Sequence, residues 1–256
     1  MMPTLRAWCA LVWLSFRRLL WSGSTLMALV PLVGCAAVAW VRDFDRGGFS
    51  PHAFDNFSRW FLTVVFVSVV IPLVALAFGT TGVGGDREDR TLLFLLIRPL
   101  PRPLVLLAKF AGMLPLALGL VVIGFWINCK LAGSIGAVAF DRYLPAVVLT
   151  TLAYLGLFQF FAVAFRHATV VALIYALFME LFLGNVPGII KRVAVNYYGR
   201  SLMFAAGRAD GLEPPDSRIF EPITSSAAET TLLGFAVVGL LASLVVFQRR
   251  EFRDLT

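Results

Sequence analysis

Hydrophobic residues are concentrated in six long runs along the chain, separated by shorter polar segments. Most runs approach the length of about 20 apolar residues that a helix needs to cross a bilayer. Helices are expected for such runs because a helix pairs its own backbone polar groups where no water is present. We therefore predict an all-α integral membrane protein, a single domain over residues 1–256 with six transmembrane helices at residues 24–41, 60–78, 104–127, 144–165, 168–183 and 230–247.

A seventh apolar segment, residues 5–21, differs from the others because it carries Arg6, Arg17 and Arg18. Arg6 and Arg17 are 11 positions apart, so they lie about 20° apart around a helix that turns ~100° per residue. This spacing is typical of an amphipathic helix that lies in the membrane interface with its arginines toward the headgroups. The alternative is that the segment is the charged front of the first span.

The polar segments between the runs are predicted to be loops. Residues 42–59 and 128–142 are short, whereas residues 184–229 form the longest polar region. Its first part, residues 189–206, mixes apolar and basic side chains and could hold short helices at the membrane surface. The glycines within residues 79–85 indicate flexible backbone leaving the membrane. Lys109, near the start of the third span, can extend its ammonium group to the interface.

Composition agrees with a membrane domain and narrows the classes of function. Hydrophobic residues make up 59% of the chain and charged residues 14%, whereas a soluble domain is about 25% charged. The net charge of +7 fits basic loops on the cytoplasmic side of a membrane. No basic soluble module is present, which argues against nucleic-acid binding. Cys9, Cys35 and Cys129 lie in apolar context without the spacing of a disulfide framework or metal motif.

Six spans place both termini on the same side of the membrane, and we expect that side to be the cytoplasm. The 22 lysines and arginines then divide 12 to 10 in favour of the cytoplasmic side. This bias has the sign of the positive-inside rule but is small.

The densest charge in the chain lies between the second and third spans, in the loop at residues 84–103. Five charged residues, Asp86 to Arg90, precede six apolar residues, Leu92 to Ile97, and prolines then end any helix. This pattern predicts a short helix of about 12 residues, ~18 Å long. Its charges form either a solvated cluster or a docking surface for a partner. Arg98 and Arg102 could instead contact lipid phosphates.

The sequence contains no catalytic constellation and no metal-binding motif. Gly79 and Gly84 have the spacing of a phosphate-binding loop, but Gly85 and Asp86 stand where that loop requires lysine and serine or threonine. We therefore expect neither a nucleotide site nor an enzyme activity on this chain, and any energy for work must come from elsewhere.

Four segments together resemble a known family. They are the charged run from Asp86 to Arg102 followed by Lys109, the stretch from Leu173 to Lys191 with Tyr175, Glu180 and Pro187-Gly188, the N-terminal amphipathic helix, and the Arg249-Arg250-Glu251-Phe252 ending. In order and spacing they are similar to the membrane subunits of ATP-binding cassette (ABC) transporters, in the type-two, exporter-like permease class. A small departure is Ala108-Lys109, where the family usually has Gly-Lys.

The resemblance implies a complex in the cytoplasmic (inner) membrane. Two permease subunits, either two copies of this chain or this chain with a sister, would pair in the membrane above two cytosolic ATPase subunits that bind ATP and Mg²⁺. The loop helix would then be a cytoplasmic coupling helix that docks on the ATPase, and residues 184–229 would be an external loop. The expected coupling residues are Asp86, Arg87, Glu88, Asp89, Arg90, Arg98 and Arg102.

Glu180 is the one acid inside a predicted span. Carboxylates in membranes are costly and usually face a bundle interior or a cavity, so Glu180 is a candidate gate or subunit contact. The alternative is solvation at the interface, because Glu180 lies near the end of its span.

Two other functions of the protein remain open. One is a membrane anchor or mechanical element that is driven by the same kind of ATPase and moves no solute. The other, less favoured with a single intramembrane acid, is a stand-alone channel or carrier.

Overall fold

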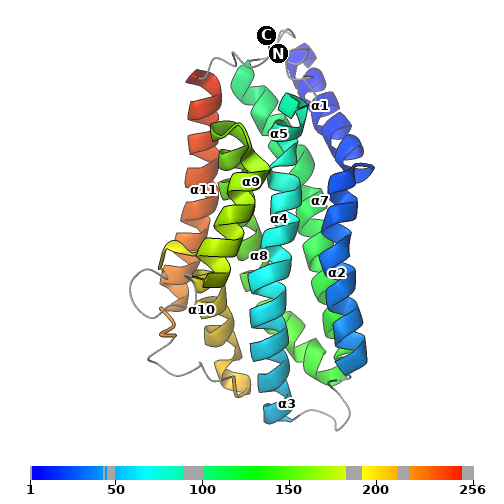
Figure 1. The fold of residues 1–256 in the computed structure, drawn as a ribbon, viewed down its shortest axis with the longest axis vertical. Coiled ribbons are helices and arrows are strands. Elements are labelled where there is room, and N and C mark those ends of the chain that lie inside the picture. The colour runs from blue at the N-terminus through cyan, green and yellow to red at the C-terminus, as the bar shows by residue number, and fades with distance from the viewer. Residues whose placement is uncertain are drawn as a thin grey trace.

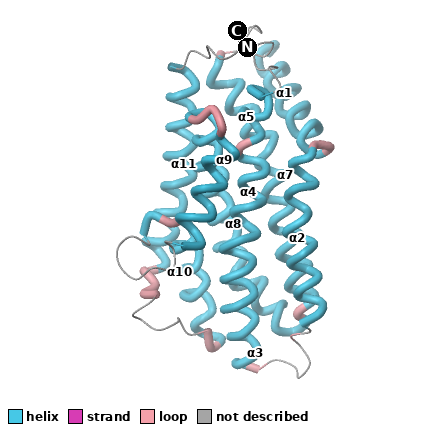
Figure 2. The backbone as a smooth tube through the Cα atoms, viewed as in Figure 1, coloured by secondary structure: helices cyan, strands magenta, loops and turns pink. Residues whose placement is uncertain are grey.

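The computed structural model describes residues 2–42, 44, 50–88, 101–182, 192–212 and 220–249, except for the side chains of 2–4, 83, 86–88 and 179–182. Every regular element within these ranges is a helix (Figure 2). The prediction of an all-α protein is therefore confirmed for the described part of the chain.

Within the described ranges, five helical segments are long and apolar enough to cross a membrane, and Figure 1 shows them side by side along the long axis of the molecule. Four of the predicted spans lie inside them, and the span at 144–165 does so except for its last residue. The segments are α2 (Gly23–Arg42), the continuous segment Pro51–Gly79 formed by α3 (Pro51–Asn56), η1 (Phe57–Val70) and α4 (Ile71–Gly79), and then α7 (Arg102–Leu131), α8 (Gly133–Ala164) and α11 (Ser225–Arg249).

The N-terminal segment forms a helix of its own, α1 (Met2–Leu20), separated from α2 by a turn at Trp21 and Ser22. The side-chain and backbone donors of Ser22 both bind the carbonyl oxygen of Leu19, which closes the end of α1. The segment is thus not a continuous front of the first span. That α1 lies in the membrane interface stays a prediction.

Two predicted loops are largely helical. Ser50 starts α3 as an N-cap, because its Oγ accepts a hydrogen bond from the backbone N–H of Ala53 at 3.2 Å, and Pro51 fits the first turn. The loop expected at 128–142 is instead a single tight turn between α7 and α8. Gly133 makes this turn with a φ of +61°, a backbone conformation that glycine adopts without strain.

The predicted span at 168–183 corresponds to two shorter consecutive helices, α9 (Ala168–Ile174, 7 residues) and η2 (Tyr175–Phe182, 8 residues). Together they are shorter than the ~20 residues of a straight crossing. Figure 1 shows α9 beginning near the end of the bundle where α1 begins, and α10 (Val195–Gly207) extending toward the opposite end beside α3. The count of six spans therefore stays a prediction.

The structure corrects the expectation that helices within residues 189–206 lie on the membrane surface. Helix α10 is buried in the bundle, packed against α8, α11 and η1. The aromatic rings of Tyr197 and Phe204 both pack on Phe220, and the guanidinium of Arg200 lies 4.7 Å from the centre of the same ring. The basic side chains of this segment favoured a surface position, but Arg200, the one that lies in α10, has its aromatic partner inside the protein.

The centre of the bundle is α8, which packs against α11, α7, α4 and α10. Its contact with α11 brings two backbones together, because a Cβ on Gly156 would lie 2.5 Å from the carbonyl oxygen of Ala236. Small residues at such crossings are typical of helix pairs in membranes, where close packing replaces the hydrophobic effect as the source of association.

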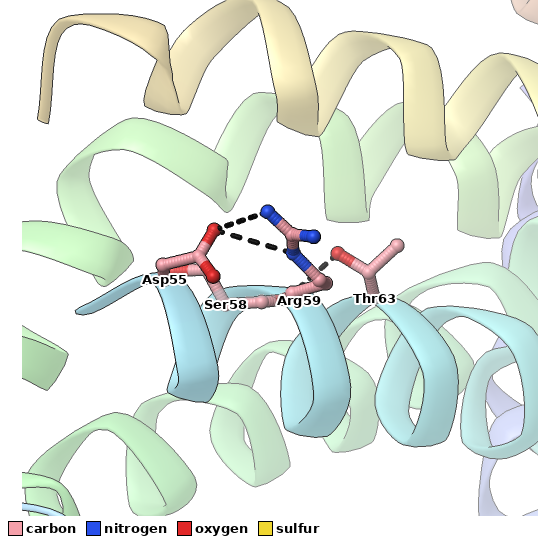
Figure 3. A network of polar contacts seen from close by, with 4 residues as sticks. All are labelled: Asp55, Ser58, Arg59 and Thr63. Atoms are coloured by element: carbon pink, nitrogen blue, oxygen red, sulfur yellow. Dashed lines mark hydrogen bonds and ion pairs between the residues drawn. The ribbon is translucent and has the colours of Figure 1, made fainter. Parts of the chain in front are cut away.

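Helix η1 has π-type backbone geometry over 14 residues in the middle of a span. Its hydroxyl groups follow the wider turn: Thr63 donates to the carbonyl oxygen of Ser58 at 2.7 Å, and Ser68 donates to that of Thr63 at 2.8 Å. Figure 3 shows the first of these bonds beside the ion pair of Arg59 with Asp55, 2.8 Å.

Candidate functional site

The structure describes the two edges of the charged segment. Asp86, Arg87 and Glu88 form the end of α5 (Thr81–Glu88), although their side chains are not among those described. Arg102 is the first residue of α7 and is exposed. The other expected coupling residues, Asp89, Arg90 and Arg98, lie outside the described residues. Figure 1 shows α5 at the end of the bundle where α1 begins and α11 ends.

Helix α5 follows α4 directly, with a single turn residue, Thr80, between them. The glycines of this segment are therefore helical, which corrects the expectation of a flexible exit from the membrane. Gly79 serves close packing, because a Cβ there would lie 2.7 Å from the Cβ of Phe158 on α8. The joint between α4 and α5 thus rests directly on the central helix.

Side-chain hydrogen bonds fasten this joint to two further helices. Lys109 on α7 is buried, and its Nζ donates to the carbonyl oxygen of Gly82 in the first turn of α5 at 3.0 Å. Thr169 on α9 donates to the hydroxyl of Thr80 at 3.3 Å. A displacement of α5 would therefore act on α7, α8 and α9 together.

Lys109 is the functional candidate whose position the sequence reasoning missed. We expected its ammonium group to extend to the interface. Its depth in the membrane stays a prediction, but the structure shows the residue inside the protein, with only 6% of it exposed. A single cation in an otherwise apolar stretch of the third span was the available signal, since a buried ammonium needs an internal acceptor.

Glu180 lies in η2, in a stretch where the structure describes the backbone but not the side chains. The position of its carboxylate therefore remains a prediction. The neighbouring part of η2 is tied to the chain beyond it, because the hydroxyl of Tyr175 donates to the carbonyl oxygen of Val193 at 3.4 Å.

Polar side chains also meet inside the bundle, between η1, α8 and α10. Asn196 on α10 donates to the hydroxyl of Ser68 on η1 at 2.8 Å, and both residues are buried. Close by, α10 approaches α8 so closely that a Cβ on Gly199 would lie 2.5 Å from the hydroxyl oxygen of Thr150. These contacts fix α10 in the bundle, and no local sequence pattern signals the pairs involved.

Among the residues that the structure describes, there is no group of three or more histidine, cysteine, aspartate or glutamate side chains that could hold a metal. Cys35 and Cys129 are buried, Cys9 is exposed, and all three are free thiols. At the α5 end of the bundle, this short helix and the turn before it contact α7, α8 and α9 through Lys109, Phe158 and Thr169.

Residues 22–252 match the sequence model of a family described as ABC-2 family transporter protein. The match begins just after α1 and includes every later helix. A search of curated proteins finds no relative of the chain.

Proposed function

Because the chain belongs to the ABC-2 family of transporter proteins and is thus a multi-pass permease, we propose that it couples ATP hydrolysis by a separate cytosolic ATPase to export or translocation of a substrate. Permeases of this family generally pair with an ABC ATPase subunit. The chain would contribute the membrane pathway, and the ATPase would hold ATP and Mg²⁺.

The observation that carries the coupling role is the attachment of α5. This helix continues a spanning segment beyond Gly79, and the contacts of Gly79, Thr80 and Gly82 join it to α8, α9 and α7. A charged helix that is docked on a moving partner can transmit force only if it is firmly held by the spans. The charges from Asp86 to Arg90, with Arg98 and Arg102, would then set the docking register on the ATPase, since complementary charges favour specificity and association rate.

The assembly that follows has two permease subunits, identical or sister chains, and two ATPase subunits below them. In the proposed orientation the end of the bundle that carries α5, the start of α1 and the end of α11 faces the cytoplasm of the inner membrane. Residues 184–229 would lie toward the outside. Glu180 would act near the outer part of the pathway, as a gate or a contact between subunits.

The test is co-purification with the ABC ATPase encoded nearest the gene, comparing wild type with an Arg87→Glu/Arg90→Glu variant. The charge reversal should abolish recovery of an ATP-hydrolysing complex. The matched control is Arg208→Glu, an exposed arginine in η5 (Arg208–Asp210), which follows α10 at the other end of the bundle. The coupling role would be contradicted if the Arg87→Glu/Arg90→Glu variant still recovered the complex as the Arg208→Glu control does. It would also be contradicted if the wild-type chain recovered no ATPase.

A further inference from the structure

A cavity of about 210 Å³ lies between α1, the first turn of α5 and α7, where α1 turns into α2. Its apolar lining residues are Leu11, Leu14 and Leu19 of α1. Its polar lining residues are two cationic ones, Arg18 and Lys109, and the hydroxyl-bearing residues Ser15, Ser22, Ser24 and Thr81. The described residues that line it include no carboxylate.

The two cations are brought to one cavity by the crossing of α1 and α7. At this crossing a Cβ on Gly112 would lie 2.8 Å from the carbonyl oxygen of Val12 and 2.9 Å from the Cβ of Ser15. Lys109 lies one turn before Gly112 on α7, and Arg18 lies one turn after Ser15 on α1. Backbone contact between the helices therefore holds both side chains against the same space.

Exposed tryptophans indicate where the membrane boundary lies. Trp21, 85% exposed, lies two residues before the start of α2, and Trp40, 73% exposed, lies in its last turn. The 20 residues of α2 span about 30 Å at 1.5 Å per residue, which is the thickness of the hydrocarbon core. Tryptophan is enriched at both membrane–water interfaces. The cavity beside Trp21 is thus at the depth of the phospholipid headgroups.

We propose that this cavity binds the phosphate of an anionic phospholipid, with Arg18 and Lys109 facing the phosphate and the three leucines of α1 facing the acyl chains. The positive end of the α2 helix dipole, at Ser22 to Ser24, adds to the attraction for an anion. A lipid bound there touches α1, α5 and α7 at once, so it would stiffen the joint that carries the coupling helix. Two points rest on the proposed function: that the lipid belongs to the inner leaflet, and that the stiffened joint carries a coupling helix.

An internal carboxylate is the alternative to a lipid phosphate at this site. Asp86 follows Gly85, a lining residue, in the sequence, and its carboxylate is the alternative counter-ion for the two cations. The experiment therefore has to separate a lipid phosphate, a free phosphate and this carboxylate.

The test uses the full chain, purified in detergent and depleted of lipid, with bound lipid counted by native mass spectrometry. The probes are phosphatidylglycerol and diacylglycerol, which share acyl chains and differ by the phosphate headgroup. Wild type should retain phosphatidylglycerol in preference to diacylglycerol. Arg18→Gln should weaken this retention about fivefold, the factor expected for one lost cation near a lipid phosphate. The matched control is Arg17→Gln, because Arg17 is exposed on the same turn and does not line the cavity.

A second variant protects the test if Arg18→Gln folds poorly. Leu14→Trp adds bulk to the lining of the cavity without a change in charge and should also reduce phosphatidylglycerol retention. Equal losses in Arg17→Gln and Arg18→Gln, or equal retention of diacylglycerol, would overturn the proposal. Displacement of the lipid by millimolar inorganic phosphate alone would overturn the lipid assignment. Binding that appears only in Asp86→Asn would show that the carboxylate occupies the site. None of these measurements needs the ATPase, so their outcome is independent of the coupling role.

Discussion

The Nζ of Lys109 donates a hydrogen bond to the carbonyl oxygen of Gly82 at 3.0 Å, across 27 positions of sequence. This bond joins the first third of α7 to the first turn of α5. It is a charge-assisted bond inside the protein, and such bonds are stronger than those between neutral groups. The attachment of α5 to the rest of the bundle therefore depends in part on a single buried side chain.

Replacing Lys109 with methionine should loosen α5 without unfolding the protein. The variant leaves the Gly82 carbonyl without this donor, but it also removes the desolvation cost of a buried ammonium, so the two effects on overall stability oppose each other. We expect faster hydrogen exchange at the backbone amides of residues 82–88 and little change in the unfolding temperature.

The control is Lys130→Met, because Lys130 lies at the other end of the same helix and is exposed. Hydrogen–deuterium exchange with mass spectrometry measures both variants. Unchanged exchange at residues 82–88 in Lys109→Met would show that the contacts of Gly79 and Thr80 suffice to hold α5.

The crossing of α8 and α11 should tolerate no side chain at Gly239. A Cβ there would lie 2.6 Å from the carbonyl carbon of Gly156, which is backbone and cannot rotate away. Gly239→Ala should therefore force the helices apart and destabilise the protein by about 1–3 kcal/mol, as overpacking does in other cores. The unfolding temperature in detergent measures the effect.

Gly234→Ala is the matched control, since Gly234 lies on the same helix and a Cβ added there would meet no atom within 4 Å. It should be neutral or slightly stabilising, because alanine is the better helix former by about 0.5–1 kcal/mol. Equal unfolding temperatures for the two variants would contradict the close crossing.

The hydrogen bond from Asn196 to Ser68 should appear as a coupling energy between α10 and η1. Ser68→Ala and Asn196→Leu each remove one partner and leave a buried polar group behind, which costs about 1–3 kcal/mol. In the double variant this penalty is shared, so the combined loss should be smaller than the sum of the single losses by 0.5 kcal/mol or more, as expected of residues in contact (about 0.5–3 kcal/mol). Additive losses in equilibrium unfolding would show that the 2.8 Å contact contributes nothing to the placement of α10.

The sequence predicted the spans that are apolar throughout and missed the elements that are not. The predicted boundaries at 24–41 and 230–247 fall inside α2 and α11, because long apolar runs have few alternatives to a spanning helix. Residues 189–206 were read as surface because they mix apolar residues with the basic residues Lys191, Arg192 and Arg200. No local pattern reveals that Arg200 packs on Phe220 or that Asn196 bonds to Ser68.

In the candidate site, too, local features were predicted from the sequence and long-range contacts were missed. The charged segment and the family were recognised from sequence, because charge density and motif order are local properties. The mode of attachment was not, because it depends on pairs such as Lys109 with Gly82 and Gly79 with Phe158, which the fold brings together. Glycine in particular reads as flexible in sequence, whereas here it permits contact between helices.

Glu180→Gln should reduce transport while leaving the assembly with the ATPase intact. Glu180 belongs to η2, the π-type helix that follows α9, whereas the coupling charges begin in the last turn of α5, at the other end of the proposed pathway. A carboxylate placed toward a bundle interior can act as a gate or a subunit contact through its charge, which glutamine removes with little change in shape.

The control is Glu229→Gln, because Glu229 is an exposed acid in the first part of α11. This variant should behave as wild type. The measurement pairs recovery of the ATPase in pull-down with flux, in inside-out vesicles, of a solute that the wild-type complex moves. Reduced flux with normal ATPase recovery supports a role in the pathway, whereas wild-type flux in the Glu180→Gln complex would mean that its carboxylate is merely solvated at the interface.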